Sequence, residues 1–449
     1  MAVPVSGPDG VARPNSSGIK VIVVGLGVAG LAAAIECHRK GHTVIAFEKV
    51  KEMKPLGDVI AISSNAARVI DKWGGGSVHE ALYSVTSDLN PAGLYDETGS
   101  LKLKSAVPGF RKGEGYLLSR GDLAVTFFEH AKSLNIDIRM GICVTEFWET
   151  DTSAGVIVDG EKIEADCVIA SDGVHSKARV PITGETPRIM SSGRAIYRAW
   201  CDASVLEVDP KTKWLTESGS DGGDDSHVFM AKDVTMVMST TKNHSLINWS
   251  CFHLDSRGAT DLFYYPATAD QVLEYIKVWP VREKLESVIR RTPPDNLIDY
   301  PLVTFEPAKN WVSKGGRMIL IGDASHPFLP TSGQGACQGI EDGAVVAIAL
   351  ELAEKGNIRQ ALEVTNKIYR RERTVQIYNL GLFALETVSN PDWSEAEKNS
   401  KLFAIPNPEW VLNHNCQKSA YDEYHKIAES IANGTEYTPQ NIPSSAVRS

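Results

Sequence analysis

A glycine turn near the start of the chain has the spacing of a loop that binds phosphate. Gly25, Gly27 and Gly30 form G-x-G-x-x-G between an apolar strand pattern and a helical pattern. The first two glycines let the backbone approach a pyrophosphate, and the N-terminus of the following helix meets its charge. Glu48 ends the next strand pattern, about 20 residues beyond the motif, where a carboxylate accepts both ribose hydroxyls. These residues predict a dinucleotide site.

A second polar loop, GDASHPFLPTSGQGACQGIEDG, starts at Gly322 and opens a helix directly after an apolar strand pattern. The amides of Gly333-Gln334-Gly335 would lie at the N-terminus of that helix, where they stabilise negative charge. Pro327 and Pro330 would stiffen the loop. His326 suits an acid–base role or a structural hydrogen bond, and the proline beside it favours the structural role.

Arg120, in YLLSRGDL, precedes a helical pattern, and its guanidinium has the fork geometry that binds a phosphate. Taken alone, it is better interpreted as an ordinary surface arginine. Its interpretation therefore depends on the other motifs.

These residues need strands and helices to position them. Residues 21–24 and 43–47 are strand patterns on either side of a helical pattern that Gly41 ends, which together form a βαβ unit. A hairpin pattern turns at Asp159-Gly160 and runs into a buried strand that ends at Ser171. Residues 317–321 form another buried strand, directly before the second polar loop.

A β-rich region interrupts this cofactor domain. Residues 193–203, 228–240 and 245–255 alternate apolar and polar side chains and include several aromatic residues, as strands of an antiparallel sheet do. Residues 270–291 then show a helical pattern that ends at the Pro293-Pro294 break. The cofactor domain resumes after this region.

Composition limits the partners. The chain of 449 residues has 46 Lys and Arg against 56 Asp and Glu, a formal net charge of −10, which argues against nucleic acid or a membrane as the main partner. Residues 1–18 form a loose tail without signal-peptide features, and no stretch suits a membrane span. The seven cysteines are scattered without C-x-x-C spacing, which favours a reducing, cytoplasmic location and no metal site.

The motifs together resemble the class A flavoprotein monooxygenases. CVIASDGVHSKAR carries the Asp-Gly element of that family, and RMILIGDASHPFLPTSGQGACQGIED carries its Gly-Asp element. The resemblance implies bound FAD, with Asp323 on the ribityl chain, and NADPH and O2 as co-substrates that bind transiently. It implies these cofactor-binding residues: Gly25, Gly27, Ala29, Gly30, Glu48, Lys49, Arg120, Asp172, Asp323, Pro330, Gly333, Gln334, Gly335 and Ala336.

The predicted fold is α/β, with a Rossmann-like FAD-binding domain interleaved with an antiparallel β-sheet substrate domain and followed by a C-terminal helical region. We expect the FAD-binding domain to comprise residues 19–80, 112–183 and 311–385. The substrate domain would comprise residues 81–111 and 184–310, and the helical region residues 386–449.

A closer resemblance is to the fungal indole-alkaloid monooxygenases of the paraherquamide, notoamide and citrinadin type. It rests on GHTVIAFEKVKEMKPLGDVIAISSNAARVIDKWG, IASDGVHSKAR and VWPVREKLESVIRRTPP. It implies oxygen transfer from a flavin C4a-hydroperoxide to the indole C2=C3 bond of a small-molecule, prenylated indole alkaloid. Epoxidation is often followed there by a semipinacol shift to a spiro-oxindole. A monomer and a dimer are both left open.

Two charged residues are candidates for the oxidation step. By strand alternation Arg198 shares a face with Ile196 and Trp200, which suits an arginine if that face lines a cavity. The resemblance implies that Arg198 points over the flavin, where its permanent charge would donate hydrogen bonds to a peroxide, an epoxide oxygen or an alkoxide. Asp58, in PLGDVIAI, would lie where the chain passes the flavin and needs a partner. A structural ion pair is the alternative for both.

Two other functions stay open. A phenol or salicylate-type aromatic hydroxylase uses the same scaffold, and a non-catalytic flavin-binding module is a further alternative. Four aromatic residues either wall an apolar substrate pocket or belong to the core: Trp200, Trp249, Phe252 and Tyr264.

Overall fold

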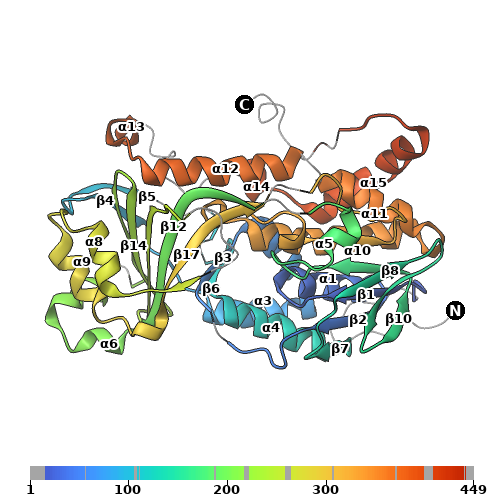
Figure 1. The fold of residues 1–449 in the computed structure, drawn as a ribbon, viewed down its shortest axis with the longest axis horizontal. Helices are drawn as coiled ribbons and strands as arrows, with labels where there is room; N and C mark the ends of the chain where they lie inside the picture. Colours follow the sequence, from blue (N-terminus) through green and yellow to red (C-terminus); the bar gives the residue numbers. More distant parts are fainter. Residues whose placement is uncertain are drawn as a thin grey trace.

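Two large sheets lie side by side, and helices from the end of the chain run along both of them (Figure 1). The computed structural model describes residues 16–55, 57–105, 109–110, 112–186, 189–216, 222–257, 264–305, 308–369, 372–398, 408–438 and 440. Most of the predicted N-terminal tail, residues 1–15, lies outside the described residues.

The first sheet is parallel and has the strand order β18–β11–β1–β2–β7. Its strands are β1 (Lys20–Val24), β2 (Thr43–Glu48), β7 (Asp137–Met140), β11 (Cys167–Ala170) and β18 (Met318–Leu320). The central strands are continuous apolar runs, as in sheets that are covered on both faces. The predicted βαβ unit and the two later strands are confirmed.

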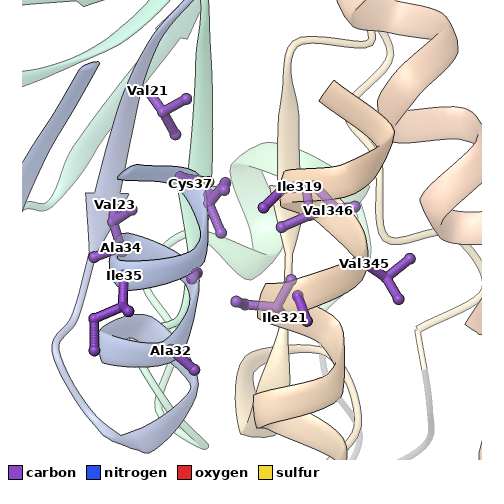
Figure 2. Close-up of a cluster of buried hydrophobic side chains, with 14 of the residues drawn as sticks. Val21, Val23, Ala32, Ala34, Ile35, Cys37, Ile319, Ile321, Val345 and Val346 are labelled. Carbon is purple, nitrogen blue, oxygen red and sulfur yellow. The ribbon is translucent and has the colours of Figure 1, made fainter. Parts of the chain in front are cut away.

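Helices α1 (Val28–Arg39) and α10 (Gly335–Ala353) pack against each other and against this sheet. Figure 2 shows Val23 of β1 beside Ala34 of α1, and Val346 of α10 beside Ile319 of β18, and all of these side chains are buried. A Cβ on Gly343 would lie only 2.6 Å from the amide nitrogen of Ala33, so the missing side chain allows the two helices to approach closely. This packing brings the N-termini of α1 and α10 to the same region.

The second sheet has eight strands in the order β16–β17–β12–β15–β14–β13–β4–β5. Its strands are β4 (Ala92–Asp96), β5 (Leu101–Ser105), β12 (Ile189–Asp202), β13 (Ser226–Ala231), β14 (Val234–Thr241), β15 (Leu246–Leu254), β16 (Tyr265–Pro266) and β17 (Leu297–Phe305). All neighbouring pairs are antiparallel except β13 and β4, which pair in parallel. The predicted antiparallel sheet is confirmed, and that one parallel pair was not predicted.

Two predicted elements are each divided in the structure. Residues 228–240 form a hairpin, β13 and β14, which turns at Lys232-Asp233 with Asp233 at a φ of +66°. Because no glycine marks this turn, the alternation of apolar and polar residues continues through residues 228–240 of the sequence without a break. Residues 270–291 contain two helices, α8 (Ala269–Tyr275) and α9 (Arg282–Ile289), because Pro280 between them has no backbone N–H.

Smaller elements complete the fold. Strands β3 (Val59–Ile62) and β6 (Tyr116–Ser119) pair with each other, and β8 (Glu146–Glu149), β9 (Ala154–Val158) and β10 (Glu161–Ala165) form a three-stranded sheet with the predicted Asp159-Gly160 turn. The remaining helices before the C-terminal region are α2 (Ser64–Ile70), α3 (Ser77–Val85), α4 (Arg120–Ser133), α5 (Arg179–Thr183), α6 (Ser204–Glu207) and α7 (Lys213–Thr216).

The C-terminal region is helical, as predicted. The predicted region, residues 386–449, contains the end of α12 (Glu372–Ser389), α13 (Trp393–Lys398), α14 (Glu409–Leu412) and α15 (Cys416–Asn433), and α11 (Ile358–Tyr369) precedes it. Helix α12 runs from α11 along the second sheet (Figure 1), where the backbone N–H of Asp233 donates to the carbonyl oxygen of Ser389 at 2.7 Å. The predicted boundary at residue 385 falls inside α12. None of the helices in the described part of the chain has the length and apolar character needed to cross a lipid bilayer.

Candidate active site

The turn between β1 and α1 leaves open space at its middle glycine. Gly25 has a φ of +88°, and a Cβ there would lie 2.7 Å from the carbonyl oxygen of Ser171. A Cβ on Gly30 would lie 1.9 Å from the carbonyl oxygen of Gly25, so α1 packs directly on the turn. Gly27 is exposed, and a Cβ there would meet nothing within 4 Å. The helix N-terminus therefore faces room for a phosphate.

Glu48 is held at the end of β2 by two backbone groups. Its Oε2 accepts from the amide of Leu26 at 2.7 Å, and its Oε1 accepts from the amide of Val50 at 3.0 Å. Each carboxylate oxygen has a second lone pair, which suits a ribose hydroxyl. Lys49, the next residue, is exposed.

Asp172 shapes the loop that follows β11. Its Oδ2 accepts from the amides of Lys177 at 2.7 Å and of Ala178 at 3.2 Å, while its Oδ1 is buried without a hydrogen-bond partner among the described residues. A Cβ on Gly25 would lie 2.8 Å from the Asp172 Cα, so this loop forms one wall of the glycine turn.

Ala29 lies where α1, α10 and the short turn η4 (Gly322–Ala324) meet. A Cβ on Gly322 or on Gly339 would lie 2.8 Å from the Ala29 methyl group. This contact brings the two predicted cofactor loops together, although they are about 300 residues apart in the sequence.

Asp323 lies in η4 beside the start of α10. Asp323 is accessible to solvent, but the protein atoms around its carboxyl group displace water and raise the pKa of that group. The charges of His326 and Arg120 act in the opposite direction. A Cβ on Gly335 would lie 3.9 Å from Asp323 Oδ1. An accessible carboxyl group in poorly hydrated surroundings suits a hydrogen bond to a ligand hydroxyl.

Asp342 of α10 stabilises this turn from inside the protein. Its Oδ2 accepts from the amide of Gly322 at 2.9 Å and lies 2.6 Å from His326 Nε2. Burial alone would lower the pKa of His326, but the Asp342 carboxylate outweighs it and raises that pKa. Both side chains are at most 2% exposed. This environment is that of a structural histidine.

Replacing Asp342 with asparagine should destabilise the protein more at low pH than at high pH. Because its pKa is raised in the folded state, protonated His326 stabilises the fold below about pH 6.5, and this contribution is lost as the pH rises through the raised pKa. Urea unfolding at about pH 6 and about pH 9 measures the effect. The free energy of unfolding of the wild type should exceed that of Asp342→Asn at both pH values, and the difference should be larger at the lower pH. Equal differences at both pH values would contradict this assignment.

The loop before α10 presents backbone groups to the same place. Pro330 starts the turn η5 (Pro330–Ser332) and is exposed, and Gly333 follows it with a φ of +61°. Gln334 is completely buried, and its backbone N–H donates to Ser332 Oγ at 3.2 Å, so this residue itself is not free to bind a cofactor. Gly335 and Ala336 start α10 and are half-buried. The N-terminus of α10 thus offers amide groups beside η4.

Arg198 and Asp58 form an ion pair between the two halves of the molecule. Arg198 Nη2 contacts Asp58 Oδ2, and the amide of Val59 donates to Asp58 Oδ1 at 2.6 Å. The two side chains are 30% and 20% exposed, so the pair is accessible to a small molecule. The amide of Arg120 donates to the carbonyl oxygen of Asp58 at 2.9 Å, which places Arg120 next to the pair. The roles of these three residues stay predictions.

Tyr300 of β17 is a site residue that the sequence analysis missed. It is half-buried and is the register partner of Ile196, on the sheet face that carries Arg198. Burial and the charge of Asp323 raise the pKa of Tyr300, whereas the charges of Arg198 and Arg120 act in the opposite direction. Tyr300 therefore lies among the predicted cofactor and catalytic residues. The alternation in LIDYPLVTF was the available signal.

The predicted aromatic wall is only partly present. Tyr197 packs in the core, so the half-buried Trp200 lies on the opposite face together with Arg198. Phe252 pairs with Ile196 and also lies on this face. Trp249 is buried in the core instead, with its Nε1 donating to Thr292 Oγ1 at 2.8 Å, and Tyr264 is 61% exposed. One residue of strand register separates Trp249 from the face of its neighbours.

The residues present fit a dinucleotide such as FAD. Open space at the glycine turn, an acceptor at the end of β2, the accessible Asp323 and the N-terminus of α10 lie on elements that contact one another. The charged pair and the aromatic side chains of the second sheet adjoin this region. The arrangement suits a redox cofactor next to a partly apolar substrate face.

Comparisons with known proteins agree with this description. A family model described as an FAD binding domain matches residues 18–379. The asperlicin C monooxygenase of Petromyces alliaceus is 47% identical over 439 residues, which cover 97% of this chain and 95% of that protein. The crystal structure of CtdE in complex with FAD and substrate 4 has a TM-score of 0.87 at 42% identity and covers 92% of this chain and 100% of that one. The FqzB crystal structure has a TM-score of 0.87 at 39% identity, over 96% of this chain and 98% of that one.

Proposed function

The chain belongs to the FAD-binding family of flavin-dependent monooxygenases, and we propose from this premise that it oxidises the indole C2=C3 bond of a fungal indole alkaloid. The proposed product is an epoxide or, after a semipinacol shift, a spiro-oxindole. One oxygen atom of O2 enters the substrate and the other leaves as water, with two electrons supplied by NADPH. Bound FAD would supply the redox chemistry that links NADPH to O2.

The observation that carries this proposal is the ion pair of Arg198 and Asp58 on a partly aromatic sheet face. Arg198 cannot act as a base, because its guanidinium stays protonated, but it donates hydrogen bonds to an oxygen that gains negative charge. Opening of an indole epoxide creates such an oxygen on the substrate. Asp58 would orient the guanidinium, and Trp200 and Phe252 would pack on the indole ring system.

The relatives support the substrate class. The names printed for two of them describe an asperlicin C monooxygenase and a notoamide E oxidase, the latter 40% identical to this chain. Both names agree with the resemblance to indole-alkaloid enzymes that the sequence motifs indicate. We include the division into FAD-binding and substrate domains in the proposal, since the first sheet carries the glycine turn and the second carries Arg198.

Anaerobic reduction of the bound flavin by NADPH tests the proposal most directly. Flavin absorbance should bleach, and a prenylated indole alkaloid should accelerate the bleaching by about tenfold or more if the substrate gates reduction. A simple phenol should have no such effect. A bleaching rate that the alkaloid leaves unchanged and the phenol increases would indicate an aromatic hydroxylase. The absence of bleaching would favour a non-catalytic flavin protein.

Product analysis under ¹⁸O2 then identifies the reaction. The alkaloid product should carry one labelled oxygen atom, at the former C2 or C3 position of the indole. Label in a phenol product and none in the alkaloid product would contradict the proposed substrate class.

A further inference from the structure

A chain of buried polar side chains connects the cofactor loop to helix α12. Gln334 Nε2 donates to Ser63 Oγ at 2.9 Å, and Asn65 Nδ2 donates to Gln334 Oε1 at 3.3 Å and to Glu341 Oε1 at 2.6 Å. Glu341 Oε2 lies 3.5 Å from Nη2 of Arg373, near the start of α12. All five side chains are at most 1% exposed. The network therefore crosses from the loop through α2 and α10 to α12.

The carboxylate of Glu341 sets the direction of these hydrogen bonds. An ionised carboxylate only accepts, so Asn65 must turn its NH2 group toward Glu341. The Asn65 carbonyl oxygen then accepts from the Ser63 hydroxyl, which leaves the Ser63 oxygen to accept from Gln334 Nε2. Gln334 Oε1 consequently faces the Asn65 amide. The charge of Glu341 thus favours one orientation of Asn65, Ser63 and Gln334, and Gln338 Nε2, which donates to Gln334 Oε1 at 3.3 Å, supports the same orientation.

Arg373 is the ion-pair partner of Glu341. Burial raises the pKa of Glu341, while the charge of Arg373 and the hydrogen bond from Asn65 oppose that rise. The guanidinium of Arg373 also lies 5.3 Å from the ring centroid of Trp410 in α14, which fixes its position. A carboxylate without such a partner would be costly in the interior.

Helix α12 contacts the cofactor loop a second time. Thr331 Oγ1 of η5 donates to the carbonyl oxygen of Gly381 at 2.7 Å. Leu385 of the same helix packs with Ile196 and Leu329, next to the substrate face. The helix that borders the substrate face thus also holds the cofactor loop at two points.

We propose that Glu341 is a positioning residue that acts through Asn65 and Gln334. It holds the loop at residues 333–335 so that the N-terminus of α10, where Gly335 and Ala336 start the helix, faces the flavin. This inference rests on the proposed use of FAD, but Glu341 and Asn65 are residues to which the motifs assign no role. It predicts that the hydrogen-bond direction, and not only the stability of the core, depends on the charge of Glu341.

Glu341→Gln is the first test. The introduced amide must turn its NH2 group toward Arg373 or toward Asn65, and both of these groups are donors, so the network loses its direction. In the full chain loaded with FAD, amide hydrogen exchange of residues 333–336 should become about tenfold faster, and the FAD dissociation constant should rise about tenfold. Mass spectrometry of the loop peptide and FAD titration measure the two effects.

Glu341→Gln with Arg373→Met should reverse both effects. The second substitution removes one donor, so the introduced amide can turn its NH2 group away from Asn65 and its carbonyl toward it. Loop exchange and the FAD dissociation constant should return to within about twofold of wild type. If Glu341→Gln does not fold, Ser63→Ala tests the link between the network and the loop, because it removes the acceptor of Gln334 Nε2 and should also speed loop exchange and weaken FAD binding.

Asp299→Asn is the matched control. Asp299 is a buried carboxylate of the second sheet, paired with His253 at 3.2 Å and with Arg257 at 2.8 Å. Its replacement should lower thermal stability to a similar degree without changing loop exchange or FAD affinity.

The inference would be overturned if Glu341→Gln and Ser63→Ala lowered thermal stability but left loop exchange and FAD affinity unchanged. The ion pair would then be merely structural. A wild-type protein that binds FAD but oxidises no indole substrate would refute the proposed function alone, because both measurements of the loop need only bound FAD.

Discussion

Arg198→Ala should lower the rate of oxygenated product formation by about 100-fold while the protein keeps its FAD. Removing one preorganised donor to a developing oxyanion costs about 10²- to 10³-fold in other enzymes. The guanidinium of Arg198 lies on the second sheet and contacts Asp58, whereas the predicted FAD-binding motifs lie on other elements. Liquid chromatography of the products, together with the flavin content of the purified variant, measures the two expectations.

Two further variants separate the role of Arg198 from a general effect on β12. Arg194 lies on the same strand and pairs with Asp233 at 3.1 Å, so Arg194→Ala removes a comparable ion pair and should leave product formation within about twofold of wild type. Arg198→Ala combined with Asp58→Asn leaves no unpaired carboxylate, yet it should stay as slow as Arg198→Ala. Recovery of product in this double variant would assign Arg198 to the ion pair and not to the substrate.

The parallel sheet was predictable because its signals are local. The strand before Gly25 is an uninterrupted apolar run, and Gly41, with a φ of +81°, ends the helix that follows. The hairpin of β13 and β14 was not predicted, since its Lys232-Asp233 turn lacks the glycine that usually marks a two-residue turn. Pairing of β13 with β4 joins segments more than a hundred residues apart and leaves no local pattern.

The candidate site shows the same division. Alternation along β12 correctly placed Arg198 and Trp200 opposite Tyr197, because side chains on a strand alternate strictly. The same rule places Trp249 in the core. The sequence analysis grouped the aromatic residues without asking which face of the strand each one occupies. The contact of Asp58 with Arg198 could be only one of two alternatives in the sequence, since Arg198 lies on β12 and Asp58 lies in the loop before β3. Such a contact depends on tertiary packing.

Gly27→Val should weaken FAD binding by about 100-fold and leave the fold intact. A Cβ on Gly27 meets nothing within 4 Å, and the backbone there is extended, with a φ of −68°, so the protein itself has room for valine. The methyl groups would occupy the space at the N-terminus of α1, where the pyrophosphate is expected. Overpacking of a filled site costs about 1–3 kcal/mol, and its upper end corresponds to about 100-fold in affinity.

FAD titration and thermal unfolding without added FAD measure these two effects separately. Gly356→Val is the matched control, because Gly356 is also exposed with nothing within 4 Å, but it lies in a turn after α10. It should leave FAD affinity unchanged.

Gly30→Ala should have a different result. Its Cβ would lie 1.9 Å from the carbonyl oxygen of Gly25, so this variant should lose thermal stability as well as FAD. Normal FAD affinity in Gly27→Val would mean that the cofactor does not pass the glycine turn, and the assignment of Gly25, Gly27 and Gly30 would have to be withdrawn.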